Sequence, residues 1–338
     1  RSSDVSSSDA MSQYTAMISL TLSDATIKRP VFRAMSFVIL ILFQTLHMAW
    51  SQDSSQVARP NPPAGYHSAV MASGHYQMPT ALDGGGKVSL FQTGLNASLG
   101  YQTPSSNRVA LSVGYQERGY DFDGISLLAG ASPWERIHFL SISLPTSLQL
   151  APEWKALMIP TLRTMVEDLG DTEQNLTGGG IAGVSYQINP RLKLGPGLGV
   201  LSQLEDSSSI FPVILVDWTI SDHWRLSTGR GTGASQGPGL TLTYDLNRSW
   251  NLMLSGRYDR FRFRTHETGL IAHGVGEDKS ASIYLTASYA YSPKVQLDLF
   301  AGCHVAGSLS MADSSGSTIS ERDYQVAPVL GFNFGMRF

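Results

Sequence analysis

The densest run of charged side chains lies between Trp250 and Thr265, where arginines alternate with Phe261 and Phe263. Its charged members are Arg257, Asp259, Arg260, Arg262 and Arg264. A guanidinium group binds phosphate or carboxylate through two parallel hydrogen bonds. The run could therefore hold the phosphates of lipopolysaccharide, or an acidic solute. Alternatively, Asp259 and Glu277 neutralise these arginines at the base of an exposed loop, and the run binds nothing.

A second set of charged residues falls on one phase of predicted strands, which we expect to face the interior of a barrel. These residues could line a channel that filters small polar solutes. Alternatively, they pair with one another and fill the interior. Because both signs occur, no preference for anions or cations follows. The set comprises Arg108, Arg118, Arg163, Glu167, Lys193, Asp217, Asp245, Arg257, Asp298, His304 and Arg337.

Catalytic chemistry has one candidate base, His138. We predict it at the outer end of a strand on the lipid-facing phase, where a lipid hydrolase would use a histidine with a neighbouring serine and a carboxylate. Serine is so abundant that no single partner stands out. No pair of histidines has the spacing of a metal site, and we predict no cofactor.

The segments that position these residues are predicted strands. Apolar residues occupy every second position from Tyr324 to Phe338, which indicates a strand with one apolar face. Similar alternation predicts fourteen strands in all, and twelve if the two weakest, 67–80 and 224–231, are lost. The other twelve are near 87–101, 108–121, 135–149, 154–168, 175–188, 191–204, 209–220, 237–247, 250–265, 279–291, 295–310 and 323–338.

The connections favour a membrane barrel over a soluble sandwich. Short turns rich in Pro, Asn, Asp and Ser alternate with longer polar loops such as 121–134, 266–279 and 312–322. A barrel with both ends on one side of a membrane needs this asymmetry. Aromatic residues such as Trp154, Trp250 and Tyr291 lie beside the short turns, as rings at a bilayer interface do. We therefore predict an all-β, antiparallel up-and-down transmembrane β-barrel.

The remaining sequence concerns export. The chain has 338 residues and a net charge of −3, and nothing in its composition suggests nucleic acid. Residues 1–51 are predicted to be an N-terminal extension followed by a secretory signal, with a basic lead at 28–33 and an apolar run at 35–46. A Pro-rich leader, 52–66, precedes the barrel, 67–338. Cys303 is the only cysteine, so no internal disulfide is possible.

The alternating strands, the aromatic belt and the terminal Phe338 resemble Gram-negative outer-membrane β-barrels. More narrowly, segments 210–213, 216–226 and 237–240, with Tyr244, look like an uncharacterised family of such barrels, a domain of unknown function. The resemblance implies membrane lipids and lipopolysaccharide as partners, and an assembly machinery that recognises Phe338. It brings no catalytic residues. We expect a passive channel for small solutes or a structural barrel in the cell outer membrane, not an enzyme. The alternative is a lipid-acting hydrolase.

Overall fold

The computed structural model describes residues 64–124, 132–173, 175–229, 239–267 and 271–338 of the chain. Strands dominate these residues, and a short 3-10 turn, η1 (Leu169–Asp171), interrupts them. No helix among the described residues is long and apolar enough to cross a membrane. The predicted extension and export signal over 1–51, and most of the leader predicted over 52–66, lie outside the described residues.

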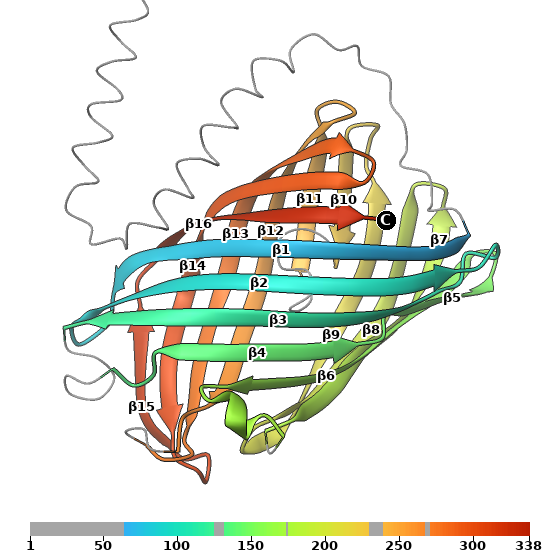
Figure 1. The fold of residues 1–338 in the computed structure, drawn as a ribbon. Coiled ribbons are helices and arrows are strands. Elements are labelled where there is room, and N and C mark those ends of the chain that lie inside the picture. The colour runs from blue at the N-terminus through green and yellow to red at the C-terminus, as the bar shows by residue number, and fades with distance from the viewer. Residues whose placement is uncertain (1–63, 125–131, 174, 230–238, 268–270) are drawn as a thin grey trace, which may run out of the picture. The chain divides into compact units, whose positions relative to one another are not determined.

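Sixteen strands form one sheet (Figure 1). They are β1 (Gly65–Ala81), β2 (Lys87–Gln102), β3 (Arg108–Asp123), β4 (Arg136–Ser143), β5 (Thr146–Ala151), β6 (Trp154–Val166), β7 (Thr177–Asn189), β8 (Leu192–Gln203), β9 (Asp206–Thr219), β10 (Trp224–Thr228), β11 (Gly239–Asp245), β12 (Trp250–Arg264), β13 (Val275–Ser292), β14 (Val295–Ala312), β15 (Thr318–Tyr324) and β16 (Ala327–Arg337). Their pairings are antiparallel except for one parallel bridge between β6 and β12.

The sheet closes on itself. Most strands pair with the strands before and after them in sequence, β16 pairs with both β14 and β1, and β13 pairs with β14. β4 and β5 share the place between β3 and β6, and β15 and β16 both pair with β14. Counting each of these two couples as one strand reduces sixteen to fourteen. The predicted fourteen-stranded barrel is therefore confirmed, and the twelve-stranded alternative is wrong.

Two predicted strands are interrupted. The strand predicted over 135–149 breaks at Pro145, which has no backbone N–H to donate. The strand predicted over 323–338 breaks after Tyr324, and the phase of its inward-facing residues shifts by one position between Tyr324 and Ala327. As a result Tyr324 faces the interior, whereas Phe334 faces outward as predicted. Placing both on one face was wrong.

The two ends of the barrel differ, as predicted. The turn end carries the short connections near residues 105, 152, 190, 222, 248 and 293, and it also holds the C-terminal Phe338 beside the start of β1. The loop end carries the other connections. Two of its loops are shorter than predicted, because β13 already begins at Val275 and β15 at Thr318. These extra residues lengthen the wall at the loop end.

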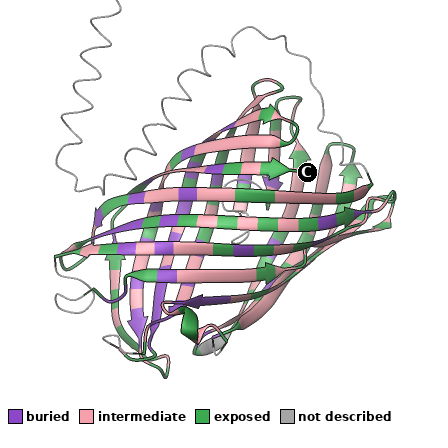
Figure 2. Ribbon diagram, in the orientation of Figure 1, coloured by how far each residue is buried: buried purple, intermediate pink, exposed green. Residues whose placement is uncertain are grey.

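The outer surface is apolar. Exposed and buried residues alternate along the strands (Figure 2), and the exposed set includes Leu95, Leu111, Leu254 and Leu285. At the turn end, exposed aromatic rings pair across neighbouring strands, for example Trp154 with Tyr186 at a centroid distance of 4.8 Å. Contiguous exposed apolar surface with an aromatic rim is typical of a barrel whose outer face contacts lipid.

A charge on this outer surface is expected to destabilise the barrel. Leu285 is 59% exposed and lies on the outward face of β13. Leu285→Arg is expected to lower the free energy of unfolding in lipid vesicles by about 2–4 kcal/mol, the cost of an arginine near the bilayer midplane. Urea titration of the refolded protein measures this. The control is Glu321→Arg, an exposed outward residue near the loop end. Equal stability of the two variants would mean that Leu285 does not contact hydrocarbon.

Candidate functional site: the closed lumen

The barrel narrows at the loop end because its strands differ in length. β10 and β11 end at Thr228 and Gly239, whereas β12 continues to Arg264. Beyond their ends, β12 bridges directly to β6 through Arg264 and Val166, and the Glu167 N–H donates to the Arg264 carbonyl at 2.9 Å. The wall at this level is therefore formed by β12, β13, β14, β15, β1, β2, β3, β4 and β6. This smaller ring encloses less space than the full barrel.

Large apolar side chains fill this ring. Trp134, Tyr120 and Phe263 meet at its centre, with the Trp134 and Phe263 rings 5.0 Å apart. Glycines leave room for two of the rings, because a Cβ on Gly276 or Gly307 would collide with Phe263 or Tyr324. We call this cluster the apolar plug. It consists of Leu82, Val88, Leu90, Tyr120, Trp134, Ile137, Met165, Phe261, Phe263, Leu309, Met311, Tyr324 and Ala327.

On the side of the apolar plug that faces the turn end, charged side chains from opposite walls meet across the lumen. Asp278 of β13 accepts hydrogen bonds from Tyr120 of β3 at 2.8 Å and Tyr324 of β15 at 3.2 Å. Arg118 of β3 lies 3.4 Å from the same carboxylate, donates to Gln92 at 2.6 Å, and stacks over the Phe261 ring. Arg118 and Asp278 have side chains only 9% and 7% exposed. The carboxylate therefore connects two walls of the barrel and closes the lumen at this level.

Two further groups complete this polar layer. Arg257 and Asp259 form an ion pair at 2.7 Å on the inner face of β12, and the Ser282 hydroxyl also donates to Asp259. His304 of β14 hydrogen-bonds with the Tyr284 hydroxyl at 2.8 Å through Nε2, and with Gln77 of β1 at 2.7 Å through Nδ1. Because these buried polar groups are paired, the layer is stable without an added ligand.

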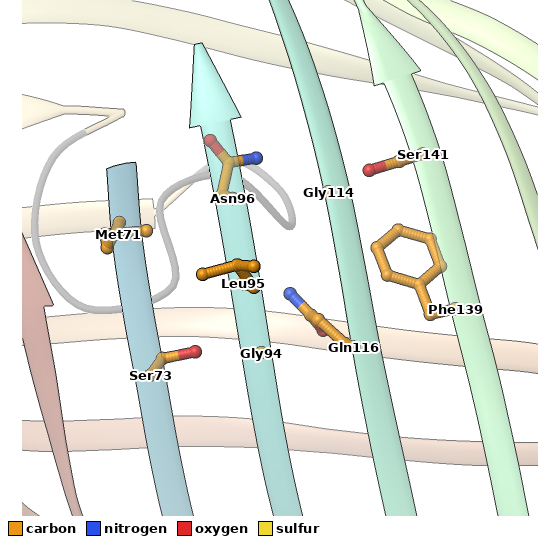
Figure 3. Close-up of a pocket in the computed structure, with 9 residues that line it drawn as sticks. All are labelled: Met71, Ser73, Gly94, Leu95, Asn96, Gly114, Gln116, Phe139 and Ser141. Carbon is orange, nitrogen blue, oxygen red and sulfur yellow. The ribbon is translucent and has the colours of Figure 1, made fainter. Parts of the chain in front are cut away.

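The lumen is wider between the polar layer and the turn end. A shallow pocket on its wall is lined by Ser73, Asn96, Gln116 and Ser141 from four neighbouring strands (Figure 3). Gly94 and Gly114 allow these side chains to lie close to the sheet, because a Cβ on either glycine would meet a neighbouring hydroxyl within 3 Å. The pocket presents hydroxyl and amide groups. Such a surface can interact with small polar solutes but holds no nucleophile–base pair.

The predicted lumen charges are spread around this wall and do not form one site. Arg163, Asp217, Asp245 and Asp298 lie on the inner faces of β6, β9, β11 and β14. Asp217 faces Lys193 in the register and lies 4.0 Å from Arg225, while Gln296 donates to Asp298 at 2.8 Å. The wall therefore carries both signs of charge, as predicted.

The arginine run divides between the two faces of β12. Arg257 and Asp259 point inward and belong to the polar layer, whereas Arg260 and Arg262 point outward and bind Glu277. Arg264, also outward, bonds Asn175, the His273 carbonyl and Glu205 beneath the loops. The run therefore does not form one binding site.

The residues that sequence reasoning missed are those that meet across the lumen. Arg118 was predicted to face inward, but Asp278, Tyr120 and Tyr324 were not among the candidates. Tyr120 and Arg118 share one phase of β3, so their inward position could have been found. The inward position of Asp278 could not have been found, because the strand was predicted to begin at residue 279.

His138 lies on the outer face of β4, beside a tyrosine and a glutamate of β3. Its Nδ1 is 2.9 Å from the Tyr115 hydroxyl and 4.0 Å from Glu117, both on β3. Within the described part of the chain, His138 has no serine partner. No cluster of three potential metal ligands occurs in those residues either.

One loop carboxylate at the loop end is held ionised. Asp168 accepts a hydrogen bond from the Gly170 N–H at 2.8 Å and lies 3.1 Å from His266. The Gly170 bond and, to a lesser degree, His266 lower the pKa of Asp168 below its usual range. This pair ties the loop after β6 to the loop after β12, next to the bridge that closes the narrow ring.

Comparisons with known proteins give one family and several distant barrels. A family model described as "Domain of unknown function (DUF6268)" matches residues 82–338. No curated protein matches the chain. The COG4313 outer membrane channel from Pseudomonas putida F1 is 12% identical, with 83% of this chain and 100% of that chain covered and a TM-score of 0.45. The P. putida toluene transporter TodX is 9% identical, with 82% and 91% covered and a TM-score of 0.39.

Proposed function

The chain belongs to the family of the domain of unknown function DUF6268, and we propose that it is an outer-membrane channel barrel for small solutes, closed at the loop end in the described conformation. Of the two solved structures compared above, one is an outer membrane channel and the other a toluene transporter. The proposal also includes contact of the outer surface with membrane lipids and recognition of the exposed Phe338 by the assembly machinery.

The observation that carries the proposal is the kind of obstruction in the lumen. A polar wide lumen leads from the turn end to the polar layer, where Asp278 joins side chains of opposite walls. Among the described residues, the obstruction there consists of side chains, not of a crossing strand. Side chains can change rotamer, or be truncated by mutation, without breaking the backbone hydrogen bonds between the strands of the barrel. A solute path would therefore open through their displacement.

Conductance across a planar lipid bilayer tests this function. The wild-type protein is expected to pass little current, whereas a Tyr120→Ala, Phe263→Ala double variant is expected to give steady ohmic conductance, because two rings of the plug are removed. Asn96→Ala, in the wide lumen, is the matched control and is expected to behave as the wild type does.

Two outcomes would contradict the proposal. A folded double variant as silent as the wild type would indicate a structural barrel. Equal, high conductance of both proteins would mean that the plug does not close the lumen. Because His138 lacks a serine partner among the described residues, we do not propose catalysis.

A further inference from the structure

One arginine on the lumen wall has no anion beside it. Arg163 lies on the inner face of β6, because Leu162 before it is 51% exposed on the outer face. The Arg163 side chain is half-buried. Among the described residues, no carboxylate pairs with its guanidinium and no group accepts a hydrogen bond from it. Arginine stays charged in proteins, and a charge held away from bulk water is costly without an anion. The position therefore favours an anionic ligand.

The carboxylates of neighbouring elements are held by other groups. Glu167, which follows β6, accepts hydrogen bonds from the backbone N–H groups of two loop residues at 3.2 and 3.0 Å. Met165 of the apolar plug stands between Glu167 and Arg163 on the inner face. Asp278, in the polar layer, binds Arg118 and two tyrosines. These two carboxylates are therefore not available to Arg163.

On one side, Arg163 borders neutral hydrogen-bonding groups. Its direct partner on β4 is Ser141, which lines the pocket shown in Figure 3. Ser141 in turn faces Gly114 of β3, where a Cβ would lie 2.9 Å from the Ser141 hydroxyl. The absence of a side chain at Gly114 leaves room beside this hydroxyl. A carboxylate that binds the guanidinium can therefore also accept a hydrogen bond from Ser141.

On the other side, the inner surface is apolar. The lumen face of an outer-membrane barrel is usually polar, but the inner faces of β6, β7, β8 and β9 carry bulky apolar side chains. Two of them lie flat against the sheet, because a Cβ on Gly199 or Gly183 would collide with Phe211 or Leu215. We call this surface the apolar wall. It consists of Ile159, Ile181, Leu201, Phe211, Val213 and Leu215.

The apolar wall begins close to Arg163. Leu201 of β8 leans over Gly179, the β7 residue that faces Thr161 in the register. Thr161 precedes Arg163 by two positions on the same face, which is about 7 Å along a strand. A small molecule with a charged group at one end and a ring or short chain at the other can therefore contact the guanidinium and the apolar wall together.

From these observations we infer that Arg163 and the apolar wall form a binding site for a small monoanionic solute with an apolar body, such as an arylalkyl carboxylate. The guanidinium binds the carboxylate through two parallel hydrogen bonds, and the apolar wall covers the body. Ligand sites commonly combine a mostly apolar lining with a few polar groups that fix orientation. The inference rests on the proposed function, because it names the class of solute that enters the wide lumen.

Isothermal titration calorimetry of the refolded full chain in detergent, with empty micelles as the blank, tests the inference. The probes are phenylpropionate, phenylpropanol, which lacks the charge, and propionate, which lacks the ring. We expect phenylpropionate to bind most tightly, because only this probe uses both halves of the site. Equal affinity for phenylpropanol would overturn the role of Arg163. Equal affinity for propionate would overturn the role of the apolar wall.

Removing the charge gives the second comparison. Arg163→Gln is expected to bind phenylpropionate about tenfold more weakly, corresponding to the loss of charge-assisted hydrogen bonds, and to bind phenylpropanol as the wild type does. The control is Lys155→Gln. Lys155 is an inward cation of the same strand, eight positions nearer the turn end, and its removal should leave the affinity for phenylpropionate unchanged. Unchanged binding in the folded Arg163→Gln variant would overturn the inference.

A third comparison remains informative if Arg163→Gln does not fold. Ile181→Asn places an amide in the apolar wall and is expected to weaken the binding of phenylpropionate and phenylpropanol while leaving propionate unaffected. Unchanged binding of phenylpropionate by the folded variant would remove the apolar wall from the site.

These measurements do not depend on conductance. The wide lumen lies on the turn-end side of the apolar plug, so the wild-type barrel should bind the probe even when it passes no current. Absence of binding, together with conductance of the Tyr120→Ala, Phe263→Ala variant, would reject the site and leave the channel. Binding by a barrel that stays silent in that variant would reject the channel and leave the site.

Discussion

An Asp278→Ala variant is expected to lose about 3–5 kcal/mol of stability at the loop end, the penalty for removing one partner of a buried ion pair. Arg118 would keep its charge in a site where its side chain is 9% exposed, with Gln92 as its remaining close acceptor. The hydroxyls of Tyr120 and Tyr324 would lose the acceptor that they share. We therefore expect the two walls to separate at this level.

Hydrogen exchange and conductance measure the two consequences. Amides of β3, β13 and β15 near the polar layer should exchange faster, and the variant should pass current in a planar bilayer. Asp278→Asn keeps an acceptor for the tyrosines and should be affected less. Asp298→Ala is the control, because this carboxylate lies on β14 in the wide lumen. If Asp278→Ala and Asp298→Ala were equally stable and equally silent, the carboxylate would not hold the lumen closed.

The sequence predicted the barrel because its signals are local. Alternation along a strand and Pro, Asn and Ser in the turns depend on neighbouring residues only, so fourteen strands and two unlike ends could be derived. Pro145 itself indicates the break in the strand, although the strand was predicted to continue through it. The phase shift after Tyr324 could not be predicted, because apolar residues continue at every second position through the break.

The closed lumen could not be predicted in the same way. Asp278 belongs to the segment 266–279, which was interpreted as a loop because it is long and polar. Beyond the membrane both faces of a strand can be polar, so β13 continues to Val275. Which side chains meet across the lumen depends on closure and on the unequal lengths of β10, β11 and β12. Closure of the barrel and the difference in strand length each depend on several segments, so no single segment reveals them.

The arginine run illustrates the same limit. The sequence left open whether a ligand or protein carboxylates neutralise Arg260, Arg262 and Arg264. The structure pairs Arg260 and Arg262 with Glu277, and directs Asp259 to Arg257 on the inner face. The fact that Lys279 stands directly opposite Arg260 could not be derived before the register was known. Ligand binding by these residues stays a prediction.

The second large effect is expected at the centre of the apolar plug. Trp134 is 1% exposed and contacts Tyr120, Phe122 and Phe263. Trp134→Ala is expected to lower the free energy of unfolding by about 3–5 kcal/mol, because it removes a large buried side chain and leaves a cavity. The residue precedes β4, and its ring joins β3 to β12. Protection of the β12 amides against hydrogen exchange should fall by the factor that corresponds to this loss of free energy.

A conservative variant separates packing from hydrogen bonding at this position. The indole N–H of Trp134 is buried, and it has no hydrogen-bond partner among the described residues. Trp134→Phe keeps most of the ring contacts and removes this unpaired donor, so its loss of stability should be far smaller than that of Trp134→Ala. Equal losses in the two variants would mean that the indole N–H has a partner, and that its bond holds the plug in place. No loss in either variant would mean that the plug is not packed in the folded protein, and the lumen would then not be closed by these side chains.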